Sequence, residues 1–176
     1  MVQITELFGN KKQFKIINHF IDNPSCEISQ TDLWKKLKFS KTTLVKHLDF
    51  LSRESILRLK RIGTSNLYSL NKENEIVKHL KILNNLLLLQ KMKKITANIE
   101  VYLFGSAARG EDAESSDFDL LVIGKINKDE MIHLIDKLKI SKTISLQIFT
   151  QQEYSSMMKK DPAFYERLEK DKIRVA

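Results

Sequence analysis

Two aspartates separated by one residue, Asp117 and Asp119, stand at the start of an apolar run that continues to Ile123. Residues two apart on a β-strand point to the same side of the sheet, so a strand here would project both carboxylates together. Carboxylate oxygens are the ligands that Mg²⁺ and similar hard cations prefer. The pair therefore predicts a divalent-cation site.

A second apolar run begins at Val101 and ends in a glycine and a serine, Gly105 and Ser106, with ten residues between Ser106 and Asp117. Glycine lets the backbone approach a ligand closely, and the N–H groups of such a turn bind anions. We therefore expect Gly105 and Ser106 to hold a phosphate. A phosphate cradle facing a metal-binding carboxylate pair is what phosphoryl or nucleotidyl transfer requires.

The segments around these residues have the periodicity of a small α/β unit with a mixed sheet, expected over residues 97–176. We expect a central strand from Phe118 to Ile123, a short helix at 107–110 and another strand at 143–150. Further helices are expected at 129–139, 152–159 and 162–170. Strands and helices occur in both halves of the chain, so the expected fold class is α+β.

Residues 1–72 alternate between helical and extended patterns. Amphipathic helices are expected at 10–21, at 33–37 after an N-cap at Thr31 or Asp32, and from Lys41 to about Glu54 after an N-cap at Ser40. Extended segments are expected at 26–29, 56–62 and 67–70, the last two joined as a hairpin through Gly63. Residues 73–96 contain no glycine or proline and read as one long connecting helix.

Charge is distributed unevenly along the 176 residues. Residues 1–100 contain 18 Lys and Arg against 9 Asp and Glu, whereas residues 101–176 contain 12 against 13, so the net charge of +8 comes from the first part. A polyanion is therefore the expected partner of the N-terminal half. The connecting helix is apolar over more than half its circumference. A surface of that width must be buried by more than one neighbouring element, and we expect a second copy of the chain, in a homodimer, to be one of these neighbours.

Composition indicates a soluble globular protein of the cytoplasm. The N-terminus does not have the basic-then-apolar pattern of a signal peptide. The apolar run Leu86–Leu89 is far shorter than the roughly 20 residues of a membrane span. The single cysteine, Cys26, cannot form an internal disulfide.

The order helix, strand, helix, helix, basic hairpin over residues 1–72 resembles the winged helix-turn-helix family. The resemblance implies binding to double-stranded DNA, with the third helix in the major groove. It places contacts at Ser40, Lys41, Thr42, Thr43, Lys46 and His47 of that helix and at Arg58, Lys60 and Arg61 of the wing. A protein-interaction module with solvated lysines is the alternative.

Residues 97–176 resemble the minimal nucleotidyltransferases of the DNA polymerase β superfamily, on Gly105-Ser106, the spacing to Asp117-Phe118-Asp119 and the tail from Ile144 to Phe164. The resemblance implies that Asp117 and Asp119 ligate Mg²⁺ (or Mn²⁺) and that Gly105 and Ser106 hold the phosphates of an NTP. Arg109 would either neutralise phosphate or form an ion pair with the acidic residues at 111–114.

Active members of that family carry a third carboxylate on a later strand. The corresponding strand here presents Ser145 and Gln147 instead, and both are weaker ligands for a hard cation. Two functions therefore stay open. The first is a DNA-binding enzyme that transfers a nucleoside monophosphate to a hydroxyl of a small molecule or of a protein such as a toxin, since the family includes antitoxins that act in this way. The second is a transcriptional regulator that senses nucleotide or a partner without turnover.

Overall fold

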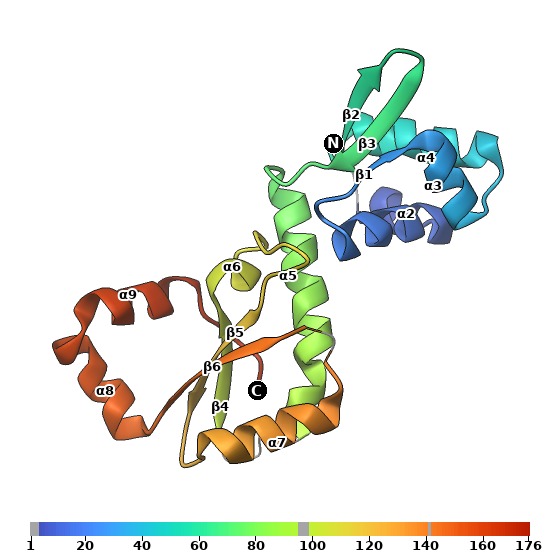
Figure 1. Cartoon of the computed structure of the whole chain (residues 1–176). Helices are drawn as coiled ribbons and strands as arrows, with labels where there is room; N and C mark the ends of the chain where they lie inside the picture. The colour runs from blue at the N-terminus through green and yellow to red at the C-terminus, as the bar shows by residue number, and fades with distance from the viewer. Residues whose placement is uncertain (1–3, 95–98, 141) are drawn as a thin grey trace. The chain divides into compact units, whose positions relative to one another are not determined.

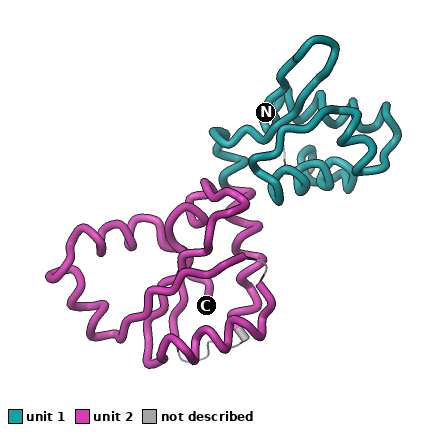
Figure 2. Tube along the Cα trace, in the orientation of Figure 1, with its two compact units in different colours: residues 1–78 teal, residues 79–176 magenta. Residues whose placement is uncertain are grey.

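Figure 1 shows the computed structural model of the chain, which describes residues 4–94, 99–140 and 142–176. The fold class is α+β, with one antiparallel and one mixed sheet. The chain divides into two compact units, residues 1–78 and residues 79–176, shown in different colours in Figure 2. Among the helices of the described residues, none combines the length and the apolar character needed to cross a membrane.

The first unit packs helices against a three-stranded antiparallel sheet with the strand order β1-β3-β2. Its elements are α1 (Ile4–Phe8), α2 (Lys11–Asp22), β1 (Glu27–Ser29), α3 (Gln30–Leu37), α4 (Lys41–Arg53), β2 (Leu57–Ile62) and β3 (Ser65–Leu70). The apolar faces of α2, α3 and α4 bury Phe20, Leu33 and Leu48 completely. Burial of these faces on one sheet explains why the amphipathic segments fold as helices.

Hydrogen bonds at the helix starts explain where α3 and α4 begin. The Ser40 hydroxyl accepts from the backbone N–H of Thr43 at 3.2 Å, so Ser40 is the N-cap of α4, as expected. The expected N-cap of α3 at Thr31 or Asp32 is wrong. The cap is Ser29, whose hydroxyl accepts from the N–H of Asp32 at 3.1 Å, and α3 therefore begins earlier, at Gln30.

Helix α5 (Glu75–Leu89) begins in the first unit and continues into the second. It is shorter than the expected connecting helix, because a 3-10 helix, η1 (Gln90–Lys94), follows it. Leu89 and Met92 are both fully buried. The apolar side of α5 thus continues into the first turn of η1. Residues 95 and 96, the expected end of the connecting helix, lie outside the described residues.

The second unit is built on a four-stranded mixed sheet with the order β6-β5-β4-β7. Its further elements are β4 (Glu100–Phe104), α6 (Gly105–Ala108), β5 (Phe118–Ile123), α7 (Lys128–Leu138), β6 (Ile144–Phe149), α8 (Gln151–Lys160), α9 (Pro162–Asp171) and β7 (Ile173–Arg174). The short helix α6 begins two residues before its expected start. Strand β5 pairs antiparallel with β4 and parallel with β6.

Helices cover both faces of this sheet (Figure 1). On one face, α5, η1 and α7 bury the side chains of Phe118, Leu120 and Val122. On the other face, α8 and α9 pack against Phe104 and Leu121. Successive residues of a strand alternate between the faces, so β5 directs Asp119 to the side of α8 and α9.

Candidate functional site

The two aspartates of the candidate metal site lie at the start of β5. Asp117 is exposed and directly precedes the strand, and Asp119 is half-buried within it. In the antiparallel pairing of β4 and β5, Asp119 is the partner of Phe104, the last residue of β4. The register thus brings the carboxylate of Asp119 to the point where β4 turns into α6, which begins at Gly105.

Gly105 and Asp119 are in direct contact. A Cβ atom added to Gly105 would lie 2.6 Å from Oδ2 of Asp119. The backbone of Gly105 also has a φ of +71°, which L-amino acids with side chains rarely adopt. Only glycine therefore fits both the turn and the approach of the carboxylate. This contact joins the two halves of the sequence motif in space.

Ser145 occupies the position beside Asp119 on the neighbouring strand. The two residues are partners in the parallel pairing of β5 and β6, and the Ser145 hydroxyl donates a hydrogen bond to the Asp119 carboxylate. Gln147 pairs with Leu121, one step further along the sheet, and is exposed. Of the two polar residues of this strand that the sequence singles out, Ser145 is thus the one beside Asp119.

The surroundings of Asp119 disfavour the negative charge of its carboxylate when no cation is bound. Burial raises the pKa of its carboxyl group above the ordinary value, and the nearby charge of Asp117 raises the pKa further, whereas the hydrogen bond from Ser145 acts in the opposite direction. A divalent cation would relieve both the burial of the charge and the repulsion. The described residues contain no cluster of three or more His, Cys, Asp or Glu side chains that could hold a metal. Two carboxylates fit Mg²⁺, which commonly takes its remaining ligands from substrate phosphates and water.

Arg109 forms the ion pair that the sequence left open, and it also has a partner that the sequence did not indicate. Its Nε donates to Glu111 and its Nη1 donates to Asp171 at the end of α9, each at 2.8 Å. The guanidinium is therefore held by two carboxylates, and it would have to leave at least one of them to contact a phosphate.

A buried polar network supports the loop between α6 and β5. Asp112 is only 4% exposed and forms ion pairs with Lys81 of α5, at 3.3 Å from Nζ to Oδ1, and with Lys142. Asn85 of α5 donates hydrogen bonds to Asp112 Oδ1 and to the carbonyl of Ala107, both at 3.1 Å. This loop leads directly to Asp117. The network therefore fixes the approach of the chain to the carboxylate pair.

Sequence reasoning missed this network. Burial by itself raises the pKa of Asp112, but the hydrogen bond from Lys142 and the charge of Lys81 outweigh that effect and hold the pKa below its ordinary value. The sequence signal was a pair of polar residues, Lys81 and Asn85, four positions apart in a helix rich in leucine and isoleucine. Positions i and i+4 lie on one face of a helix, and that face is buried here.

In the first unit, the expected DNA-contacting residues of α4 have different environments. Lys41, Thr42 and Lys46 are exposed, and Lys41 lies over the ring of Trp34, 4.8 Å from its centroid. Ser40 uses its hydroxyl for capping. His47 is only 7% exposed, and its Nδ1 lies 3.0 Å from Oε1 of the buried Gln13.

The three expected basic residues of the hairpin do not share one face. All three are exposed on β2, where Arg58 and Lys60 point to one side and Arg61 to the other, because side chains alternate along a strand. Arg58 donates to Asn71 at 2.8 Å, and Lys60 lies 3.5 Å from Glu27. Arg61 is thus presented separately from the other two.

The sequence model of the nucleotidyltransferase domain matches residues 87–174, which include Gly105, Ser106, Asp117 and Asp119. The chain belongs to this family. A Methanocaldococcus jannaschii protein, named as a candidate protein adenylyltransferase, is 35% identical over 54 residues, which are 31% of this chain and 54% of that protein. The chain thus spans about half the length of this curated relative. A crystal structure of a candidate nucleotidyltransferase from Sulfolobus solfataricus is 23% identical and covers 56% of this chain and 85% of the solved chain, with a TM-score of 0.36.

Proposed function

We propose that the second unit binds a nucleoside triphosphate with Mg²⁺, or Mn²⁺, and transfers the nucleoside monophosphate to a hydroxyl group. The observation that carries the proposal is the contact between Gly105 and the Asp119 carboxylate, because it unites a phosphate-binding turn with a cation-binding pair. Asp117 and Asp119 would hold the cation, and the turn at Gly105 and Ser106 would hold the terminal phosphates. The cation would neutralise phosphate charge and orient the leaving group.

In the transfer, the oxygen of the acceptor hydroxyl attacks the α-phosphorus. A new P–O bond forms, the bond to pyrophosphate breaks, and the hydroxyl releases its proton. Positioning and charge neutralisation are most of what a protein contributes to such a reaction. Membership of the nucleotidyltransferase family and similarity to a named candidate protein adenylyltransferase favour ATP as the donor and a protein as the acceptor. A toxin is one such acceptor.

Ser145 favours a second candidate function. On the strand where the family resemblance leads us to expect a third carboxylate, the residue beside Asp119 is a serine whose hydroxyl donates a hydrogen bond to it. A serine cannot act as a general base near neutral pH, so nucleotide binding can persist while transfer is slow. In this alternative, the second unit senses nucleotide or a partner for a transcriptional regulator.

Incubation with each α-³²P-labelled NTP and Mg²⁺ or Mn²⁺, with and without cell lysate, distinguishes the two functions. We expect labelled acceptor with the wild-type chain and none with Asp119→Asn. The exposed Asp136 of α7 offers a matched control, and Asp136→Asn should retain the activity. If neither the wild type nor Asp119→Asn transfers label while the wild type still binds nucleotide, the transfer reaction is refuted and the sensing function is favoured.

We also propose that the first unit is a winged helix-turn-helix module that binds double-stranded DNA. Its helix order, its three-stranded sheet and the basic β2–β3 hairpin support this proposal, as does the net positive charge of residues 1–100. The N-terminal part of α4 would enter the major groove. Because His47 is buried against Gln13, we assign it a positioning role rather than a base contact.

A gel shift or an anisotropy titration with double-stranded DNA tests this second proposal. Binding should weaken as salt rises and should weaken further in Lys41→Ala and Arg61→Ala. Unchanged binding in both variants would refute the placement of the recognition surface.

Leu83 and Leu87 of α5 are 53% and 58% exposed, which supports the expected homodimer. The homodimer stays a prediction, to be measured by light scattering.

A further inference from the structure

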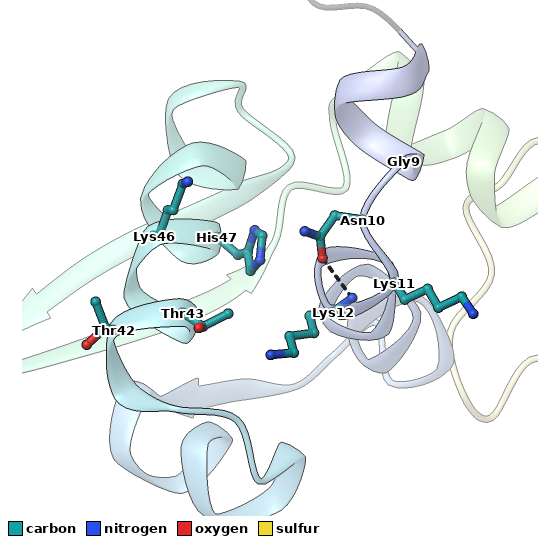
Figure 3. A pocket seen from close by; sticks show the side chains of 8 residues that line it. All are labelled: Gly9, Asn10, Lys11, Lys12, Thr42, Thr43, Lys46 and His47. Carbon is teal, nitrogen blue, oxygen red and sulfur yellow. Dashed lines mark hydrogen bonds between the residues drawn. The ribbon is translucent and has the colours of Figure 1, made fainter.

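A cavity of about 540 Å³ opens between the start of α2 and the N-terminal half of α4 (Figure 3). Lysines of both helices line it, Lys11 and Lys12 of α2 and Lys46 of α4, and the side chain of Lys11 extends away from the wall formed by α4 (Figure 3). Thr42 and Thr43 add hydroxyl groups to its wall. A concave surface lined by lysines of two helices and by two threonine hydroxyl groups has the chemistry of an anion site.

The lysines of this cavity form no ion pair with any residue that the structure describes, because none of the three has a carboxylate within ion-pair distance. Lys46 and His47 also line a neighbouring cavity. Glu6 and Asp49 contribute carboxylates to that neighbouring cavity, whereas none of the acidic residues that the structure describes lines the first one. An anion in the first cavity would therefore relieve repulsion that the fold leaves in place.

Buried hydrogen bonds hold the two walls at a fixed separation. Gln13 of α2 is only 4% exposed, and its Nε2 donates to the carbonyls of Glu6 and Leu7, at 2.7 and 3.2 Å. Its Oε1 is thereby directed to Nδ1 of His47, which must carry the proton of this bond. The bond ties α4 to α2 at His47, which lines the cavity, so the cavity has a fixed wall.

The lysines, not His47, supply the positive charge. Burial lowers the pKa of His47, and the charges of Lys46 and Lys12 lower it further, which favours the neutral form of the ring. The same effect indicates that Lys12 and Lys46, from different helices, both act on this one ring. Nζ of Lys12 lies 6.0 Å from the centroid of the Phe39 ring, next to the residue that caps α4. The charge of α2 thus reaches the start of α4.

We propose that this cavity binds a backbone phosphate of double-stranded DNA, with Lys11 and Lys12 of α2 acting alongside Lys46 of α4. The inference rests on the proposed DNA binding by α4 and adds a contact helix that the sequence did not indicate. Thr42, Thr43 and Lys46 belong both to the cavity and to the proposed recognition surface. A duplex that places its major groove on the start of α4 therefore carries a flanking phosphate to the cavity. Phosphate contacts of this kind fix the register of a protein on DNA.

The test is a fluorescence-anisotropy titration of the full chain with a labelled duplex of mixed sequence, repeated from 50 to 300 mM salt. Non-specific affinity depends on phosphate contacts, so no operator sequence is needed. Lys12→Gln should weaken binding about eightfold at 0.1 M salt and reduce the slope of log K against log salt by about 0.9. Lys46→Gln should act similarly. Lys15→Gln removes an exposed lysine of the same helix outside the cavity and should change the slope much less.

The possible outcomes separate this inference from the function on which it rests. If the wild type binds the duplex and Lys12→Gln matches Lys15→Gln in both affinity and slope, the cavity is not a DNA contact while DNA binding stands. If the wild type does not bind the duplex, DNA binding and this inference both fail. Calorimetric titration with inorganic phosphate covers the other source of the same group. If the wild type binds phosphate but not DNA, and Lys12→Gln abolishes the phosphate binding, the cavity is a site for a free anion. That result would overturn the proposed contact with DNA.

Discussion

Replacement of Asp112 by asparagine should destabilise the second unit strongly, because it removes the one negative charge between two lysines. Lys81 is only 3% exposed and the side chain of Lys142 is 18% exposed, so water compensates them poorly. The asparagine can still accept the hydrogen bond from Asn85, so the main cost is the loss of the negative charge beside the ammonium groups of Lys81 and Lys142. Removing one partner of a buried pair costs about 3–5 kcal/mol, and we expect about 3 kcal/mol here.

For a unit of the size of residues 79–176, a loss of about 3 kcal/mol corresponds to a fall of roughly 10–20 °C in the melting temperature. Urea denaturation followed by circular dichroism at pH 7 measures the free-energy difference. Asp136→Asn, which neutralises an exposed carboxylate of the same unit, is the control and should stay within about 0.5 kcal/mol of the wild type.

The pH dependence gives an independent check with a fixed sign. Interactions with Lys142 and Lys81 hold the pKa of Asp112 below its ordinary value in the folded chain. The ionised group therefore stabilises the fold above its unfolded pKa of about 3.9, and this stabilisation is lost as the pH falls through the lower folded value. The difference in the free energy of unfolding between the wild type and Asp112→Asn should therefore decrease as the pH falls. A loss below about 1 kcal/mol at pH 7, close to that of Asp136→Asn, would refute the view that the pair is desolvated.

Three further substitutions test the carboxylate site. Gly105→Ala should cost at least about 1 kcal/mol more than Gly63→Ala in urea denaturation, because both positions have positive φ but only the first places a Cβ against Asp119; equal losses would contradict that contact. Ser145→Asp should supply the third carboxylate and raise the rate of labelled-nucleotide transfer roughly 100-fold, and an unchanged rate would show that this position is not the one that limits turnover. Asp119→Asn should raise the melting temperature in metal-free buffer at pH 7, because the folded environment disfavours the ionised group, and the gain should disappear as acid protonates the wild type; calorimetry that finds a lower melting temperature would contradict the direction of the pKa shift.

Strand β5 and helix α4 could be predicted from the sequence because their signals are local. Strand β5 begins at Phe118, where the predicted apolar run begins, and α4 begins directly after its predicted N-cap, Ser40. Each of these signals depends on residues only a few positions apart in the chain. The partners of Arg109, Asp112 and His47 could not be predicted in this way. Asp171, Lys81 and Gln13 lie 62, 31 and 34 positions away along the chain, so only the tertiary fold brings them together.

The same distinction applies to the departure at Ser145. The sequence shows that residues 143–150 contain no carboxylate. The parallel register of β5 and β6 adds that Ser145 is the neighbour of Asp119. The consequence for Asp119, a hydrogen bond that partly offsets the effect of burial on its pKa, depends on that register. No local pattern in residues 143–150 encodes it.

The central claim is that the turn at Gly105 and the carboxylates of Asp117 and Asp119 form one site for Mg²⁺ and a nucleotide. Isothermal titration calorimetry of the full chain with each NTP, with Mg²⁺ and with EDTA, tests it most directly. We predict Mg²⁺-dependent binding that Asp119→Asn weakens at least tenfold and Asp136→Asn leaves unchanged. Binding that is indifferent to Mg²⁺ and equal in the wild type and Asp119→Asn would contradict the claim.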